Sequence, residues 1–525
     1  MDSSLWRQVA RESELAEGGM KLVEDGEEKV LLVRREGRIY AIGHKCPHYQ
    51  EKLEKGVVVG DEIICKSHQA RFDVRTGRVT SPPARDGLPV YPVKVEDGGV
   101  WIGPRVPSRP SAPAGLPADD PRTFLILGAG AAGSAAAETL RREGFAGRIV
   151  MVSADREGPY DRPTLSKDFI TGKAGEDKLP LRDAEFYSAQ RIELVTGRRV
   201  VSLDPSRRAV RLEGGEEVAF DKALLATGGT PRRLPVPGAE NPGCLVLRSA
   251  DDARAILAAA AKAKSVTVVG AGFVGTELAG SLRDRGLAVS VTAPEDLPLG
   301  ALLGPRVSAY VKGLYEAKGV SFLMGRSIVK IESTARGMAV ILSDGAVLES
   351  DFVVMGAGIQ PAVEYLAGTG LVEDGGVPVD DGMHARAPGI FAAGDIAVVA
   401  DPDWGTRRVE HWVVAERQGV RAALCMLGKD PGPQELNFFW SKQAGVSLKY
   451  AGYARQFDQV AYRGVVEDGA FLAGYYFRGA LKAAATIGLP PQLIAVERLM
   501  SRGARISPSE LADPDVDLLA LARSH

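Results

Sequence analysis

The sequence predicts a multi-domain protein with an all-β domain, two doubly wound α/β domains and an α+β C-terminal domain. Three observations lead to this prediction. Short strand-like segments fill about the first hundred residues, a strand–glycine loop–helix unit then occurs twice, and the residues from about 435 onward alternate strands before ending in helices. A chain of 525 residues is too long for one hydrophobic core, so several domains are expected.

Changes in composition set the expected domain boundaries. Residues 1–103 contain the strand-like segments KVLLVRR, RIYAIG, GVVVGDEIIC, YPVKVED and GVWIG, separated by Gly and Asp turns. Residues 104–121 contain six prolines and predict an extended spacer. The remaining segments are a first α/β domain in two parts, 122–245 and 366–434, an inserted second α/β domain, 246–365, and the C-terminal domain, 435–525.

The composition narrows the classes of function. The net charge is −2 and there is no long basic run, so we expect neither a nucleic-acid partner nor attraction to anionic lipid. No uncharged apolar stretch reaches the roughly 20 residues that a membrane-spanning helix needs. The first twenty residues carry four acidic side chains and match neither a secretory signal nor a transit peptide. We therefore expect a cytoplasmic protein that does not associate with membranes.

Two of the four cysteines have a histidine close by in the sequence. The segments CPH (46–48) and CKSH (65–68) each follow a strand-like segment, and sixteen residues separate them. Two thiolates and two imidazoles suit a tetrahedral zinc ion. Zinc fingers, however, usually pair Cys with Cys and His with His in sequence, whereas here each loop supplies one of each, which lets one iron take both thiolates and the other both imidazoles. The predicted ligands of a [2Fe–2S] cluster are Cys46, His48, Cys65 and His68.

Residues 1–103 resemble Rieske ferredoxin domains. Beyond the ligand loops, the family's pattern is matched at Phe72-Asp73, Thr76-Gly77, Pro83-Ala84 and the closing strands. High-potential respiratory members of that family carry an extra cysteine in each loop and hydroxyl donors to the cluster. The corresponding residues here are Tyr49 or Gln50, Ser67, Ala70 and Phe72. Because neither Ala nor Phe can donate a hydrogen bond, the resemblance implies a low-potential, ferredoxin-type carrier.

Two glycine-rich loops, GAGAAG and GAGFVG, each follow an apolar strand and open a helix. In this setting, backbone N–H groups and the helix dipole bind a pyrophosphate. Asp155 lies 22 residues beyond the first loop, just past the strand RIVMV, where a carboxylate can accept hydrogen bonds from ribose hydroxyls. We therefore predict two dinucleotide sites, built on Gly128, Gly130 and Gly133 and on Gly270, Gly272 and Gly275.

The order of motifs from residue 122 to about 500 resembles that of flavoproteins with two dinucleotide-binding domains. The strings PYDRPTLSK (159–167), ATG (226–228), GD (394–395), EHW (410–412) and FFWS (438–441) are typical of their ferredoxin reductase and apoptosis-inducing-factor-like branch. The resemblance implies that the first glycine loop binds FAD and the second binds NAD(P)H. The further cofactor contacts expected are Arg162, Lys167, Val200, Thr227, Gly228, Gly358, Gly394, Asp395, His411 and Trp412.

The nicotinamide site is expected at the second loop. Glu277 lies two residues after Gly275, and the resemblance implies that it pairs with Lys167 near flavin N5, so Lys167 and Glu277 are the predicted catalytic residues. The helix dipole alone would also favour a carboxylate at this place. Beyond the strand VSVT the chain has Glu295, which we expect at the ribose, and no adjacent Arg to receive a 2′-phosphate. NADH is therefore favoured over NADPH.

These features together imply an NAD(P)H-dependent FAD oxidoreductase with a Rieske domain. A hydride from NADH would reduce FAD, and electrons would pass singly to the cluster and on to an oxygenase or a ferredoxin-like protein. The helix after the first loop contains no cysteine, so disulfide chemistry on the flavin is not expected. An NADH-responsive redox sensor remains an alternative function, and a homodimer is compatible with the sequence.

Overall fold

The computed structural model describes residues 6–26, 28–107 and 120–524. Residues 108–119, which make up most of the predicted proline-rich spacer, lie outside the described residues. None of the helices in the described part of the chain is long and apolar enough to cross a membrane.

The N-terminal domain contains three antiparallel sheets, and residues 6–26 and 28–107 include no α-helix. The sheet orders are β1-β11-β10, β2-β3-β4-β9 and β5-β6-β7-β8. The strands are β1 (Arg7–Arg11), β2 (Met20–Asp25), β3 (Glu28–Arg35), β4 (Arg38–Gly43), β5 (Val57–Val59), β6 (Glu62–Ile64), β7 (Arg71–Asp73), β8 (Val79–Ser81), β9 (Val90–Tyr91), β10 (Val93–Glu96) and β11 (Gly99–Ile102). Strand β3 is buried on both faces, because Val30 and Leu32 enter one hydrophobic cluster while Leu31 and Val33 enter another.

Two segments that the sequence predicts as single strands each form two strands. GVVVGDEIIC forms the hairpin of β5 and β6, which turns at Gly60 with a positive φ of 60°. YPVKVED is interrupted at Pro92, so β9 pairs with β4 while β10 pairs with β11 in a different sheet. Proline has no N–H for a ladder, which explains the second break.

The first parallel sheet has the order β14-β13-β12-β18-β30 and draws strands from both parts of the first α/β segment. Its elements are β12 (Thr123–Leu127), α1 (Ala131–Arg142), β13 (Arg148–Val152), α2 (Ala184–Ala189), β14 (Ile192–Val195), β18 (Lys222–Leu225), β30 (Ile390–Ala392) and α6 (Trp412–Met426). Helices α1 and α6 pack closely, since a Cβ at Gly419 would lie 2.1 Å from the carbonyl oxygen of Ala132. Smaller sheets at its edges are β15 (Val200–Asp204), β16 (Ala209–Leu212) and β17 (Glu217–Ala219), and β29 (Val377–Val379), β31 (Ala397–Asp401) and β32 (Gly405–Arg407).

The second parallel sheet has the order β20-β27-β21-β22-β23. Its elements are β20 (Cys244–Val246), α3 (Ala250–Ala260), β21 (Ser265–Val269), α4 (Phe273–Asp284), β22 (Ala288–Ala293), α5 (Gly300–Ala317), β23 (Val320–Met324) and β27 (Phe352–Met355). The additional strands are β24 (Ile328–Thr334), β25 (Gly337–Leu342) and β26 (Val347–Ser350), and the pair β19 (Gly229–Pro231) and β28 (Ile359–Pro361). The pair β19–β28 joins the two α/β domains.

The C-terminal domain is an antiparallel sheet of order β33-β34-β37-β36-β35, followed by helices. Its elements are β33 (Phe438–Gln443), β34 (Val446–Gly452), β35 (Gln459–Val465), β36 (Ala470–Phe477), β37 (Ala480–Ile487), α7 (Pro490–Ser501), α8 (Pro508–Ala512) and α9 (Leu518–Ser524). These four parts confirm the predicted fold class.

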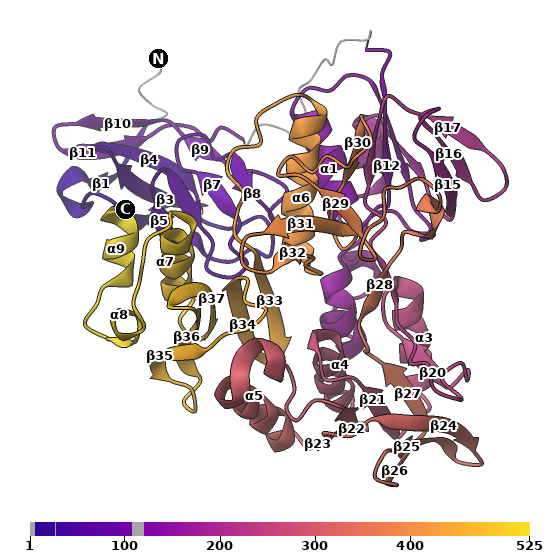
Figure 1. Ribbon diagram of the computed structural model, residues 1–525. Coiled ribbons are helices and arrows are strands. Elements are labelled where there is room, and N and C mark those ends of the chain that lie inside the picture. Colours follow the sequence, from indigo (N-terminus) through magenta and orange to yellow (C-terminus); the bar gives the residue numbers. More distant parts are fainter. Residues whose placement is uncertain (1–5, 27, 108–119, 525) are drawn as a thin grey trace.

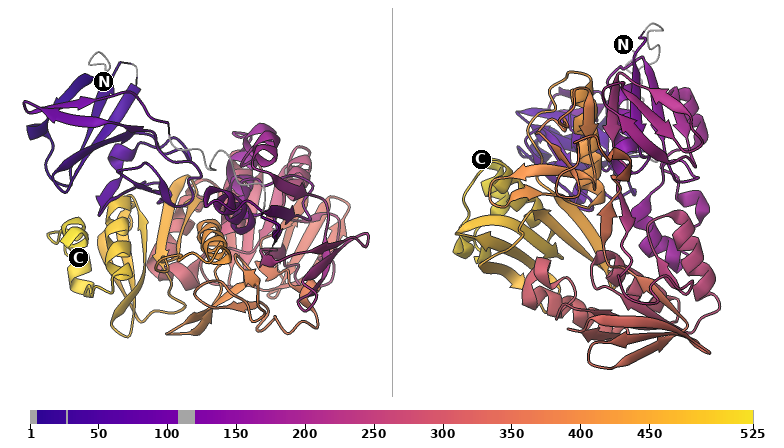
Figure 2. Two further views of the ribbon diagram at one scale, coloured as in Figure 1. Left: turned by 90° about the horizontal axis from the view of Figure 1, so that it is seen from above. Right: turned by 45° about the vertical axis from the view of Figure 1, so that its right-hand side comes forward.

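The N-terminal domain lies against the C-terminal domain, beside α7 and the edge strand β33 (Figure 1). The view from above shows the same neighbours side by side (Figure 2). A small apolar cluster crosses the boundary, in which Val57, Val59 and Ile64 pack on Ile494 of α7. The chain therefore folds so that the two Cys/His loops approach the rest of the protein at β33.

Candidate functional site

The two Cys/His loops, residues 46–51 and 65–70, have the same backbone turn. In each loop the cysteine N–H donates to the carbonyl five residues on, at 2.8 and 2.9 Å, and the cysteine carbonyl accepts from the N–H four residues on, at 2.9 and 3.0 Å. Gln50 and Gln69 occupy the same left-handed position, both with φ of 57°. The loops follow β4 and β6, as predicted, and present their cysteine and histidine side chains in matching ways.

The four predicted metal ligands come together in pairs. Cys46 and Cys65 are each 1% exposed and lie in one hydrophobic cluster. The hydrogen bond from the Cys46 thiol lowers the pKa of Cys65 to about 7. The Nδ1 atoms of His48 and His68 lie 3.1 Å apart. Burial lowers the pKa of His48 to about 4 and that of His68 below its usual range, so both imidazoles are neutral at neutral pH with lone pairs available for a metal.

The pairing of these four side chains bears on the two metal centres that the sequence left open. The thiols contact each other and the imidazoles contact each other, which suits two metal ions with two ligands apiece. The four side chains therefore fit a [2Fe–2S] cluster.

The first glycine loop forms a cradle at the N-terminus of α1. A Cβ at Gly128 would lie 2.1 Å from the carbonyl oxygen of Ala226, and one at Gly133 would lie 1.9 Å from that of Gly128. A Cβ at Gly130 would meet only the Arg162 guanidinium, at 3.9 Å. The outer glycines are thus required by packing, while the middle one leaves open space next to helix N–H groups that no side chain caps. This cradle fits a dinucleotide pyrophosphate.

The second glycine loop repeats the arrangement at the N-terminus of α4. A Cβ at Gly270 would lie 2.4 Å from the carbonyl oxygen of Gly356, and one at Gly275 would lie 2.1 Å from that of Gly270. A Cβ at Gly272 would meet nothing within 4 Å, and no side chain caps this helix either. The second loop therefore fits the same chemical group as the first.

The remaining predicted flavin contacts lie on several elements of the first α/β domain. Arg162, beside Gly130, donates to Asp155 at 2.7 Å. Arg248 donates to Asp395 at 2.7 Å, and its buried Nε has no partner in the described structure. Val200 is the first residue of β15, and Trp412 is the first residue of α6. Thr227 Oγ1 donates to the Ala362 carbonyl at 2.7 Å. Two glycines have positive φ: Gly228 (φ 67°) lies next to Arg248, and Gly394 (φ 79°) lies next to Ala132. The unpartnered guanidinium nitrogen is a donor available to a bound cofactor.

Lys167 and Glu277 form the ion pair that the sequence predicted. Their Nζ and Oε2 atoms lie 2.7 Å apart, and Glu277 is 6% exposed. Lys167 also donates to the Pro163 carbonyl at 2.7 Å. The pair joins the first α/β domain to the start of α4 in the second, between the two glycine loops.

The fold adds an arginine beside the segment predicted to bind the ribose at the second site. Glu295 and Asp296 are exposed beyond β22, and Gly358 has a φ of 85° with open space at its Cβ position. The fold also brings in Arg326, whose N–H donates to the Ala293 carbonyl at 3.2 Å. Sequence reasoning missed this arginine because it follows β23 and is far away along the chain. Its side chain, however, pairs with Asp344 at 2.7 Å.

Strand β33 supplies residues between the metal-ligand loops and the flavin side. The ring of Trp440 lies 4.1 Å from that of His68. Its neighbour Phe439 stacks on His411, with centroids 3.8 Å apart and planes inclined by 9°. Burial lowers the pKa of His411 to about 4, so this ring is neutral. The FFWS motif alone assigns no role to Trp440, because only the docking of two domains shows what it contacts.

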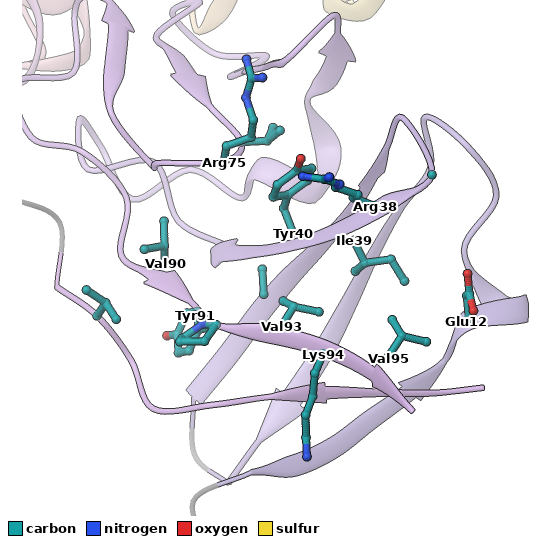
Figure 3. Close-up of a pocket in the computed structure, with 15 residues that line it drawn as sticks. Glu12, Arg38, Ile39, Tyr40, Arg75, Val90, Tyr91, Val93, Lys94 and Val95 are labelled. Atoms are coloured by element: carbon teal, nitrogen blue, oxygen red, sulfur yellow. The ribbon is translucent and has the colours of Figure 1, made fainter. Parts of the chain in front are cut away.

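The other two cysteines and a hollow in the N-terminal domain lie apart from the predicted site residues. Cys244 and Cys425 are free thiols, and no disulfide joins any of the four cysteines. A hollow of about 570 Å³ lies in the N-terminal domain between β4 and β10, lined in part by Arg38, Tyr40 and Val93 (Figure 3). It contains none of the predicted site residues.

Comparisons with known proteins agree with this arrangement. Three family models match: Rieske [2Fe-2S] domain over residues 5–92, pyridine nucleotide-disulphide oxidoreductase over 122–419, and reductase C-terminal over 438–522. The chain is 35% identical over 521 residues to apoptosis-inducing factor 3 of Homo sapiens, covering 96% of this chain and 85% of that one. It is 37% identical over 397 residues to the anthranilate 1,2-dioxygenase system ferredoxin–NAD(+) reductase component of Burkholderia cepacia, covering 75% and 98%.

A solved structure gives the same result for the reductase part. The reductase in the crystal structure of the covalent putidaredoxin reductase–putidaredoxin complex superposes with a TM-score of 0.74 at 28% identity, covering 78% of this chain and 100% of that one. The chain thus belongs to the pyridine nucleotide-disulphide oxidoreductase family, as an NAD(P)H-dependent FAD oxidoreductase of the ferredoxin reductase type that carries a Rieske [2Fe–2S] domain.

Proposed function

We propose that this protein transfers electrons from NADH through FAD to its own Rieske cluster and on to an electron-accepting protein, such as an oxygenase or a ferredoxin. One observation carries the proposal. Adjacent residues of β33, Phe439 and Trp440, contact His411 on the flavin side and His68 in the metal-ligand loops, respectively. One strand thus contacts a residue of each proposed redox site, which supports electron transfer between them within a single chain.

The proposed sites use the residues that the fold has brought together. Cys46, Cys65, His48 and His68 would hold the cluster. FAD would be held by Gly128, Gly130, Gly133, Asp155, Arg162, Lys167, Val200, Thr227, Gly228, Gly394, Asp395, His411 and Trp412. NADH would be held by Gly270, Gly272, Gly275, Glu295 and Gly358. When bound, the flavin supplies the change from two-electron to one-electron chemistry.

The chain's own residues orient the reactants. Glu277 fixes the Lys167 ammonium at 2.7 Å, so a positive charge is held between the two dinucleotide sites. The His411 ring is neutral and stacks on Phe439, so it would pack against the flavin without placing a charge beside it. Trp440 packs against the ring of His68, with the ring centroids 4.1 Å apart. These groups would orient the cofactors, and the proposed electron transfer needs no general acid–base triad.

Charges at the ribose end support NADH as the donor. The carboxylates of Glu295 and Asp296 are exposed beyond β22, where they favour ribose hydroxyls and disfavour a 2′-phosphate. The nearby Arg326 side chain is engaged by Asp344 at 2.7 Å. Similarity to a dioxygenase reductase component and to a reductase in complex with putidaredoxin supports a protein as the acceptor.

Stopped-flow mixing of the purified holoprotein with NADH tests the proposal. The flavin absorbance should bleach first, and the cluster signal should follow as one electron passes from the flavin to the cluster. Replacing Cys46 by Ser should abolish the second phase and leave the first, because one ligand of the cluster is lost. A cluster that stays oxidised, or zinc in place of iron, would refute the electron route. Slow turnover with cytochrome c, together with a long-lived reduced complex, would support the NADH-responsive sensor instead.

A further inference from the structure

A buried lysine of the C-terminal domain lies beside the metal-ligand loops. Lys449 is 6% exposed and sits on β34 directly opposite Trp440 of β33. Cross-strand partners project from the same face of a sheet, so Lys449 shares the face on which Trp440 contacts His68.

The ammonium group of Lys449 has little compensation. Its Nζ donates to Ser447 Oγ at 3.2 Å, and in the described part of the chain no carboxylate comes within ion-pair distance of it. Burial, and then the nearby Lys66, lower the pKa of Lys449 to about 8. The side chain therefore still carries its charge at neutral pH.

Such a residue costs stability. A buried charge that lacks an ionic partner is unfavourable, and an apolar side chain of similar volume usually replaces it without loss. Folding alone therefore gives no reason for a lysine at this place. A nearby centre that gains negative charge during function does give one.

We propose that the buried positive charge of Lys449 raises the reduction potential of the Rieske cluster docked against it. The inference rests on the proposed function. Reduction adds one electron, and hence one negative charge, to the group held by Cys46, Cys65, His48 and His68. A buried cation nearby stabilises that added charge more than it would in water. Because Lys449 belongs to the reductase and not to the Rieske domain, docking itself makes the cluster a better acceptor for flavin electrons.

Redox titration of full-length protein, followed by the EPR signal of the reduced cluster, tests this inference. Lys449→Met should shift the cluster midpoint downward, and Lys449→Arg, which keeps the charge, should restore it. Lys442→Met provides the matched control. Lys442 projects from the same face of β33 but is 47% exposed, so its charge is screened and the midpoint should stay at the parental value.

A stability measurement separates an electrostatic role from a structural one. Lys449→Met should unfold at the parental temperature or above it while its midpoint falls. Lys449→Gln removes the same charge with a polar side chain, so it decides the question if the Met variant fails to bind its cluster. An unchanged midpoint in a cluster-loaded charge-removing variant would overturn the inference and leave the proposed function standing. A parental protein without a Rieske EPR signal would overturn the proposed function itself.

Discussion

Glu277 is the residue on which three segments of the chain converge. Its carboxylate accepts hydrogen bonds from Ser166 Oγ at 2.5 Å, Lys167 Nζ at 2.7 Å and Ser441 Oγ at 2.6 Å. The first two donors belong to the first α/β domain, the third belongs to β33, and Glu277 itself lies in α4. The carboxylate therefore links both dinucleotide sites to the strand that contacts the Rieske domain.

Replacing Glu277 by Gln should affect both stability and hydride transfer. The amide cannot balance the Lys167 charge and brings N–H groups where an acceptor is needed. The free energy of unfolding should fall by roughly 1–3 kcal/mol. Flavin reduction by NADH should slow by about tenfold or more, which corresponds to about 1.4 kcal/mol in the barrier. Denaturant titration and stopped-flow absorbance measure the two effects.

Glu316→Gln is the matched control, because Glu316 is an exposed carboxylate on α5 whose partner is Lys312 one helical turn away. It should change neither quantity appreciably. Parental kinetics in Glu277→Gln would show that this carboxylate has only a structural role.

At the scale of single residues, the sequence predicts the role of a side chain when that side chain belongs to a motif of characteristic spacing. The Cys/His pairs and the Lys167–Glu277 pair could be proposed because each belongs to a recognisable local motif, and the fold does bring their members together. Trp440, Lys449 and Arg326 could not be given roles. What each of them contacts depends on how separate domains or distant loops meet, and nothing in the adjacent sequence records it.

At the scale of elements, the glycines of one loop differ in backbone angle and in the space around them. In the second loop, Gly270 needs a φ of 102° and closely approaches Gly356, whereas Gly272 has ordinary backbone angles and faces open space. A side chain at Gly272 would therefore be accommodated by the protein but would occupy the place proposed for the pyrophosphate.

Gly272→Val should separate nucleotide binding from folding. We expect the KM for NADH to rise by about tenfold or more while the melting temperature stays within a degree or two of the parental value. Gly270→Ala should instead lower the melting temperature, since its Cβ would lie 2.4 Å from a carbonyl oxygen. Gly313→Ala, in the middle of α5 with open space around it, controls for the loss of a glycine. A parental KM in Gly272→Val would exclude this loop as the NADH site.

The elements themselves were predicted best where the apolar pattern was strong. The parallel strands β12, β13, β21 and β22 are continuous apolar runs, and the structure places them as expected. Strand β37 cannot be predicted in this way, because its sequence, ALKAAATI, is rich in alanine, which has no preference for strands. Its place between β34 and β36 is decided by tertiary packing.

At the scale of the whole molecule, largely buried arginines connect the N-terminal domain to the first α/β domain. Arg85 forms ion pairs with Glu138 of α1 and, at 3.1 Å, with Glu416 of α6. The neighbouring Asp86 accepts two hydrogen bonds from Arg182, both at 2.8 Å. Burial raises the pKa of Glu416 to about 8, and Arg85 opposes that shift. This network favours one fixed orientation of the Rieske domain.

The sequence could not predict this docking. A proline-rich spacer is compatible with a mobile carrier as well as with a fixed one, and the charged residues Arg85 and Glu138 look like ordinary surface residues in their own segments. Only the assembled domains show that both side chains are largely buried and paired.

Replacing Arg85 by Ala should loosen the Rieske domain and slow the transfer of electrons to it. The buried Glu416 would lose its cation and Glu138 would keep only Arg182, which should weaken docking by about 2–5 kcal/mol. Flavin reduction by NADH should stay within twofold of the parental rate, whereas the following cluster reduction should slow and become sensitive to salt. Arg75→Ala is the control, because Arg75 pairs with Asp61 inside the N-terminal domain. Stopped-flow traces at low and high salt measure both phases. Parental cluster reduction in Arg85→Ala at every salt concentration would mean that electron transfer does not depend on this interface.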